Sequence, residues 1–152
     1  MPGAATHAVF VRASGSAKRA PECDLALTAV GAFAGGGGTL TGVDNTLVGR
    51  NAGYVLTSGT NNTFLGSLSG DANTTASNNT AVGYASLSAN TTGDALTAIG
   101  KDSLKTNTTG RFNTALGYES LGLNTTGANN VALGKGALYS NTTASENTAV
   151  GF

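Results

Sequence analysis

The chain has 152 residues, of which 39% are hydrophobic, 6% are aromatic and 23 are glycine. Eight basic and eight acidic residues give a formal net charge of zero, so the chain lacks the basic surface with which proteins bind nucleic acid. No apolar run approaches the length of a membrane span, and we therefore expect neither nucleic-acid binding nor membrane insertion.

Residues 1–26 form an N-terminal segment without repeats, and they contain His7 and Cys23, the chain's one histidine and one cysteine. No recognisable motif or orienting acid accompanies this pair, so we assign it no catalytic role. A single cysteine excludes an intrachain disulfide, and no cluster suggests a metal or another cofactor. The segment 8–11 (AVFV) has β-strand character and is expected to cap the first coil or to pair with a neighbouring chain.

Residues 27–44 are a degenerate first copy of the repeat that follows. The segment 27–31 (LTAVG) precedes the matching segment at Asn45 by 18 positions, which places one extra residue in the run Gly35–Gly38. This run lacks the Gly-Lys-Ser/Thr ending of a phosphate-binding loop, and we interpret it as a loosened turn.

Residues 45–152 repeat with a period of 17, in six full copies and one partial copy. The segment NTAVGY at 79–84 returns as NTALGY at 113–118 and as NTAVGF at 147–152. We number the 17 columns of the unit from Asn45. Each unit contains two short extended stretches and two turns of small residues, which predicts an all-β parallel β-solenoid or β-roll with one coil per unit.

Two columns carry the predicted core ladder. Column 4 is always aliphatic and column 9 is leucine in four copies, and column 5 is always glycine, which indicates a corner with positive φ or a close neighbouring backbone. The predicted core residues are Val48, Leu65, Val82, Ile99, Leu116, Leu133 and Val150 in column 4 and Leu87, Leu104, Leu121 and Leu138 in column 9.

The predicted core is thin for the number of residues that it orders. Each coil fixes 17 residues at about 1 kcal/mol or more of backbone entropy apiece, whereas each buried aliphatic side chain returns about 1.5–3 kcal/mol. We therefore expect further burial in a homo-oligomer, either a homotrimer or a filament. The small residues of columns 3 and 8 (Ala81, Ala98, Ala115, Ala132, Ser86, Ser103, Ser120 and Ala137) are expected to permit close approach between chains.

Asparagines recur in column 12 and are followed by threonine. We predict that stacked asparagines form a hydrogen-bonded ladder along the rod. The same tripeptides match the N-glycosylation sequence, and two further matches precede column 1, so a glycosylated surface is the alternative. The residues concerned are Asn73, Asn90, Asn107, Asn124 and Asn141 in column 12, with Asn61 and Asn78 as the additional sequons.

The aliphatic-glycine-x-x-small pattern of columns 4–8 resembles the head repeats of trimeric autotransporter adhesins, whose shorter unit folds as a left-handed parallel β-roll in a trimer. The full unit, as in residues 113–118 followed by Leu121 and residues 124–127, is more similar to arrays in phage tail fibres and large surface proteins. The resemblance covers residues 45–152. It implies a trimeric, elongated, surface-binding shaft.

These observations favour a structural or adhesive fibre protein, extracellular, at a cell surface or on a virion, with a cell-surface or glycan receptor as a further partner. A self-assembling and N-glycosylated extracellular filament is the first alternative, and a carbohydrate-active solenoid enzyme is the second. Asp71, Asp94, Asp102 and Glu119 fall at scattered positions, so we expect no carboxylate pair placed for acid–base chemistry and no enzymatic activity.

Overall fold

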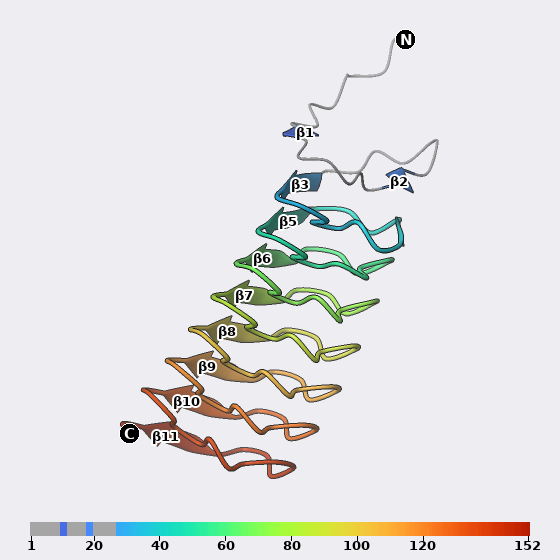
Figure 1. Cartoon of the computed structure of the whole chain (residues 1–152). Helices are drawn as coiled ribbons and strands as arrows, with labels where there is room; N and C mark the ends of the chain where they lie inside the picture. The colour runs from blue at the N-terminus through green and yellow to red at the C-terminus, as the bar shows by residue number, and fades with distance from the viewer. Residues whose placement is uncertain (1–9, 12–17, 20–26) are drawn as a thin grey trace.

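The computed structural model describes residues 10–11, 18–19 and 27–152, and it shows them as a stack of parallel coils (Figure 1). All regular elements in this part of the chain are strands, so the predicted all-β solenoid is confirmed. The strands are β1 (Phe10–Val11), β2 (Lys18–Arg19), β3 (Leu27–Val30), β4 (Thr39–Leu40), β5 (Asn45–Val48), β6 (Thr63–Leu65), β7 (Thr80–Val82), β8 (Thr97–Ile99), β9 (Thr114–Leu116), β10 (Val131–Leu133) and β11 (Thr148–Val150).

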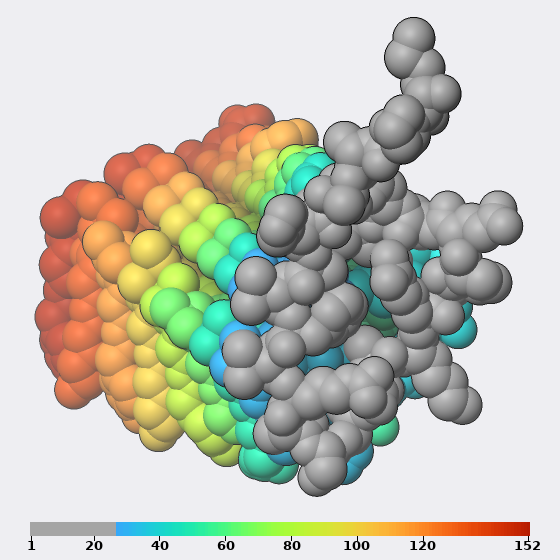
Figure 2. Space-filling view, turned by 90° about the horizontal axis from the view of Figure 1, so that it is seen from above, coloured from blue at the N-terminus to red at the C-terminus, as the bar shows by residue number. Residues whose placement is uncertain are grey.

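A parallel sheet runs the length of the stack in the order β1-β3-β5-β6-β7-β8-β9-β10-β11. From β5 onward each residue pairs with the residue 17 positions later, as Thr80 does with Thr97. Between β3 and β5 the offset is 18, because Leu27 pairs with Asn45, and this matches the predicted insertion. Identical columns therefore stack on one another, and Figure 2 shows files of atoms running from coil to coil.

From β5 onward each coil contributes one strand, and the second extended stretch expected from the sequence consists of turns and bends. Backbone hydrogen bonds nevertheless join the coils on this side, since the amide of Leu87 donates to the carbonyl of Ser103 (3.0 Å) and that of Thr91 to Thr108 (3.0 Å). Polar backbone groups are thus paired without a regular second sheet.

The column 4 part of the core prediction is wrong. The exposed fraction is 46% for Leu65 and Leu116, 36% for Ile99 and 77% for Val150, and Val48, Val82 and Leu133 are half-buried. Successive side chains of a strand point to opposite faces, so column 3 takes the inner position and column 4 the outer one. The buried column 3 residues are Leu47, Phe64, Ala81, Ala98, Ala115 and Ala132.

Column 9 lies inside, as expected, with Leu87, Leu104 and Leu121 fully buried and Leu138 partly buried against the same cluster. Column 8 is also inside, which contradicts the expectation that its small residues, and those of column 3, face other chains. Ser86 is fully buried and its Oγ donates to the carbonyl of Ala98 at 2.8 Å. Small residues are needed at column 8 because the coil interior is narrow.

The invariant glycine of column 5 lies where adjacent coils approach most closely. Gly83 has φ 133°, and a Cβ at this position would lie 2.6 Å from the carbonyl oxygen of Gly100 in the next coil. Both reasons offered for this column, positive φ and a close backbone, therefore apply together.

The N-terminal segment contributes two short strands to the end of the stack. β1 pairs in parallel with β3, Phe10 opposite Ala29, and β2 pairs with β4, Lys18 opposite Thr39. β1 therefore pairs with the first coil of its own chain, as expected for a cap. The rest of residues 1–26 lies outside the described part of the chain.

Candidate functional site

The outer face of the long sheet carries two parallel files of side chains. Column 2 is threonine in every coil from β5 to β11 except β10, where Val131 stands, and column 4 is aliphatic throughout. Because the strands pair in register, the column 4 side chains form a continuous apolar stripe along the rod, which we call the aliphatic stripe. Its members in β5–β11 are Val48, Leu65, Val82, Ile99, Leu116, Leu133 and Val150.

Column 6 borders the aliphatic stripe with aromatic and basic side chains. Lys101 places its ammonium 5.4 Å from the ring centre of Tyr118 in the next coil, and Lys135 lies 5.1 Å from that of Phe152. These are cation–π distances. Tyr118 also hydrogen-bonds Glu119, and this bond together with the carboxylate charge raises the pKa of the Tyr118 hydroxyl.

The predicted asparagine ladder is present in column 12 from Asn90 to Asn141. The Nδ2 of Asn107 donates to Oδ1 of Asn90 (3.0 Å), that of Asn124 to Asn107 (2.9 Å), and that of Asn141 to Asn124 (2.9 Å). Each Nδ2 also donates to the carbonyl three residues later, as Asn107 does to Gly110 (3.0 Å). Asn73 stands apart, because its buried Oδ1 has no hydrogen-bond partner in the described residues.

A second asparagine ladder, equally developed, runs along column 1, where the sequence also allows one at Asn79 and Asn113. Asn62 and Asn130 each donate a backbone and a side-chain bond to the Oδ1 of the asparagine one coil earlier, Asn45 and Asn113. Leu96 replaces the asparagine in one coil, and its amide still binds Oδ1 of Asn79 at 2.9 Å. The signal was the near-invariant asparagine that opens each unit.

The asparagines of the sequons divide into two groups. Asn73, Asn90, Asn107 and Asn124 are fully buried, and the amide nitrogen that a glycan would occupy donates hydrogen bonds inside the coil. Asn141 is half-buried and bonded in the same way. Asn61 and Asn78 are exposed, at positive φ, on the corner before column 1. In the folded chain these last two are the accessible sequons.

Two side chains that were expected to be scattered lie together. Asp102 and Glu119 are 17 residues apart, share column 7, and line one hollow of about 190 Å³ with Lys105 and Tyr139. A second hollow of about 270 Å³ lies at corresponding columns near the other end, lined by Phe33, Arg50, Asn51 and Tyr54. The expectation of dispersed carboxylates is therefore wrong for this pair.

The Gly35–Gly38 run behaves as a turn whose amides are engaged. Gly35 donates to the carbonyl of Ala52 (2.9 Å) and Gly36 to that of Phe33 (3.1 Å). These bonds take up amides that a phosphate cradle would need.

Other candidate chemistry is limited in the described residues. Within residues 10–11, 18–19 and 27–152, no group of three His, Cys, Asp or Glu side chains is placed to hold a metal ion. The same residues contain no helix that is long and apolar enough to cross a membrane. His7 and Cys23 lie outside the described residues.

Comparison with protein-family models, with curated proteins and with solved structures finds no match to this chain.

Proposed function

We propose that the chain is a structural and adhesive module that self-associates through the outer face of its sheet. The observation that carries this proposal is the aliphatic stripe. Scattered exposed apolar residues are ordinary, but a continuous apolar file on a flat surface is typical of a protein–protein contact. The in-register sheet makes the stripe as long as the stack itself.

The chemistry of the face favours a second copy of the same chain as the partner. Column 2 threonines and column 4 aliphatic residues form uncharged files, and charged residues enter at column 6, at the border. An apolar centre with a polar rim is the usual composition of a protein interface. Pairing of identical coils would also bring the same columns into contact along the whole rod. The similarity of the unit to trimeric fibre repeats favours three copies.

The interior supplies a further reason for association. Much of the coil core consists of alanine, serine and asparagine, so the single chain buries few large apolar side chains per residue. Covering the aliphatic stripe would add the burial that the coil interior lacks. We therefore expect the contact between chains at column 4, and no longer at columns 3 and 8, whose side chains lie inside the coil.

Static light scattering coupled to size-exclusion chromatography tests the proposal. We expect the full chain to elute with a mass near three times 14.9 kDa. The double variant Ile99→Glu/Leu116→Glu should shift to a monomer, because it places two charges per chain inside the contact.

Phe112→Glu is the matched control, because Phe112 is 60% exposed and lies in column 17, where Glu146 already shows that a charged residue at positive φ is accepted. It should leave the mass unchanged. The proposal would be overturned if the parent chain were a folded monomer. It would also be overturned if Phe112→Glu abolished association and the double variant did not.

We extend the proposal to the setting: attachment at an extracellular, cell-surface or virion location, on the resemblance of the repeat unit. The filament alternative is favoured by one observation, the exposure of Asn61 and Asn78, since glycans there would leave the aliphatic stripe free. Electron microscopy separates the two, because discrete short rods support the trimer and long uniform threads support the filament.

A further inference from the structure

A hollow on the side of the rod arises where column 10 loses its side chain. This column holds Lys105, Gly122 and Tyr139 in three successive coils, so the glycine leaves a gap between two long side chains. A Cβ on Gly122 would lie 2.9 Å from two ring atoms of Tyr139. The Tyr139 ring therefore lies against the glycine backbone, and the side chain remains 40% exposed.

The hollow is also lined by the two carboxylates of column 7. The side chain of Asp102 is only 10% exposed and is held by two lysines: Nζ of Lys105 lies 3.1 Å from Oδ1, and that of Lys101 lies 3.6 Å from Oδ2. Glu119 follows one coil later and forms no ion pair in the described part of the chain. The hollow is thus lined by one carboxylate that is ion-paired and one, bonded to Tyr118, that is not, and the Lys105 ammonium lies beside Asp102.

From this arrangement we infer that the hollow binds a single neutral hexose unit of a surface glycan. A pyranose ring has an apolar C–H face, which fits an aromatic ring such as Tyr139, and hydroxyl groups at its rim. Carboxylates accept hydrogen bonds from neighbouring hydroxyls, and charge-assisted bonds of this kind are the stronger ones. Lys105 supplies a donor to a hydroxyl oxygen.

The size and the charge of the hollow exclude other classes of ligand. Its volume of about 190 Å³ is below the roughly 300–1,000 Å³ of pockets that enclose larger molecules. Lys101 and Lys105 both pair with Asp102, so the charge that repels phosphate and other anions is that of Glu119. Lys105 repels a bare cation, and only two carboxylates face the space.

The second hollow provides an internal comparison, because Tyr54 occupies the same column five units earlier. Its ring also lies over a glycine: a Cβ on Gly37 would be 2.9 Å from Cζ of Tyr54. Phe33 packs edge-on against this ring with centroids 6.4 Å apart, and Arg50 and Asn51 complete the lining without a carboxylate. It therefore lacks the charged acceptors that the first hollow offers to sugar hydroxyls.

This inference rests on the proposed function, since one shallow sugar site binds weakly and contributes to attachment when several copies act together. The two proposals can fail separately. Loss of association leaves sugar binding measurable on the monomer, and absence of sugar binding leaves the mass of the oligomer unchanged.

Proton–nitrogen NMR titration of the full chain tests the site. The probes are the methyl glycosides of glucose, galactose, mannose and N-acetylglucosamine, with methyl glucuronide as the anionic control. We expect at least one neutral glycoside to shift the amide signals of Gly122 and Leu123, and the glucuronide to leave them unchanged.

Three variants separate this site from a general surface effect. Tyr139→Ala and Glu119→Gln should each weaken binding about tenfold or more, because each removes one wall of the site. Gly122→Ala should do the same by displacing the Tyr139 ring, and Ser88 shows that column 10 accepts a Cβ. Tyr54→Ala, the matched control, should leave the affinity within about twofold.

Thermal unfolding of each variant confirms that it folds. Failure of all four neutral glycosides to shift these signals would overturn the inference. So would an equal loss of binding in Tyr54→Ala, or binding of the glucuronide as strong as that of its neutral counterpart.

Discussion

The first two full coils, residues 45–78, and the later coils, residues 79–146, fill the same interior in opposite ways. In the later coils column 3 is alanine and column 9 is leucine, as in Ala81 and Leu87. In the early coils column 3 is large and column 9 is glycine: Leu47 with Gly53, and Phe64 with Gly70. A side chain from one wall of the coil thus replaces a side chain from the other.

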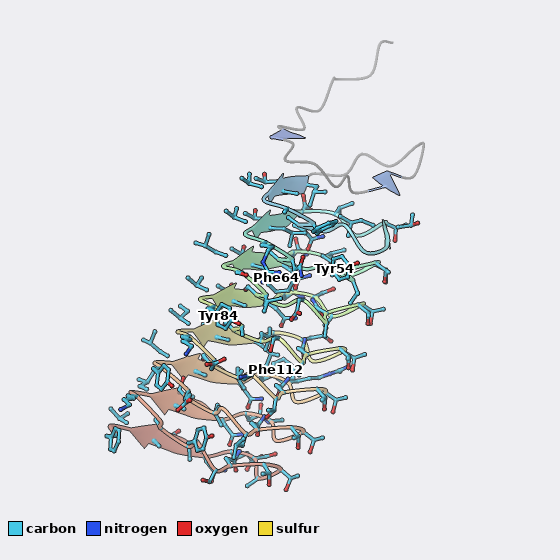
Figure 3. All side chains as sticks on the ribbon, viewed as in Figure 1. Tyr54, Phe64, Tyr84 and Phe112 are labelled. Atoms are coloured by element: carbon cyan, nitrogen blue, oxygen red, sulfur yellow. The ribbon has the colours of Figure 1, made fainter. Side chains whose placement is uncertain are left out.

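The contacts show that this exchange conserves volume at one point in space. A Cβ on Gly53 would lie 2.9 Å from Cδ2 of Leu47, and one on Gly70 would lie 2.6 Å from the Phe64 ring. Figure 3 shows Phe64 within the stack, where it is fully buried, while Tyr54 and Tyr84 are exposed. The repeat therefore specifies a filled interior rather than a residue at each column.

The largest effect is expected from breaking this exchange in the early coils. Phe64→Ala should lower the free energy of unfolding by about 3–5 kcal/mol, because no side chain replaces the ring. Gly70→Leu alone should also destabilise, since its Cβ meets Phe64. The double variant Phe64→Ala/Gly70→Leu recreates the Ala81/Leu87 pair and should recover most of the loss, to within about 1.5 kcal/mol of the parent.

Chemical denaturation of the four chains gives the coupling energy. Leu87 has φ 58° and Gly70 has φ 56°, so leucine at position 70 meets a backbone that already accepts it elsewhere. Additive effects of the two substitutions would show that the columns do not share one volume.

A smaller loss of stability is expected when an asparagine of column 12 is replaced, and it should differ between the later coils and the early ones. In the later coils Asn107 donates to Asn90 and accepts from Asn124. Asn73 instead follows Leu56 of the previous coil, and its buried Oδ1 has no hydrogen-bond partner among the residues that the structure describes. Asn107→Leu should cost about 2–3 kcal/mol, because it removes the acceptor of one buried N–H of Asn124 and the side-chain donor to the buried carbonyl of Gly110.

Asn73→Leu should cost less than half as much, since it removes an oxygen that is already unsatisfied and extends the pattern of Leu56. Both variants are compared by thermal and urea unfolding. Equal losses would mean that the ladder adds nothing beyond the bond each asparagine makes to its own turn.

The sequence predicted the architecture well because stacking forces every coil to repeat. The 17-residue period, the glycine of column 5, the buried leucines of column 9 and the ladder at Asn107 all follow from columns that cannot vary freely. The inner face of the strand was misassigned, since alternation along a strand gives two faces without saying which is inside. Alanine at Ala98 is inside because Leu104 fills the coil, and Ile99 is therefore outside.

The corners at columns 7, 9 and 17 were also missed, and they carried a weaker signal. Columns 7, 9 and 17 adopt positive φ in every full coil, including at Leu104, Phe112 and Glu119, which are residue types with little preference for it. Asn51, Asn61, Asn78 and Asn129 and the glycines Gly53, Gly70 and Gly136 occupy the same columns. Asparagine and glycine recurring at one column across an array would have indicated these corners.

The smallest effect concerns Asp71, the column 10 residue of an early coil, where the next coil has Ser88. Desolvation by burial raises the pKa of Asp71, with backbone hydrogen bonds opposing it, and one carboxylate oxygen is buried without a hydrogen-bond partner in the described residues. A folded pKa above the unfolded value means that protonation stabilises the fold. This stability is present below the unfolded pKa of about 3.8 and is lost as the pH rises through the folded pKa.

Asp71→Asn removes the ionisation and keeps the shape, so it should raise the free energy of unfolding at neutral pH. Asp71 is half-buried, and solvent screening limits the gain to a few tenths of a kcal/mol. The advantage should vanish near pH 3, where both side chains are neutral. Urea unfolding at the two pH values measures the difference, with Asp94→Asn as the control, because Asp94 pairs with Arg111 (3.5 Å) and accepts from the amide of Ser77 (2.8 Å). A gain at Asp71 that persists at pH 3 would assign the effect to packing instead of charge.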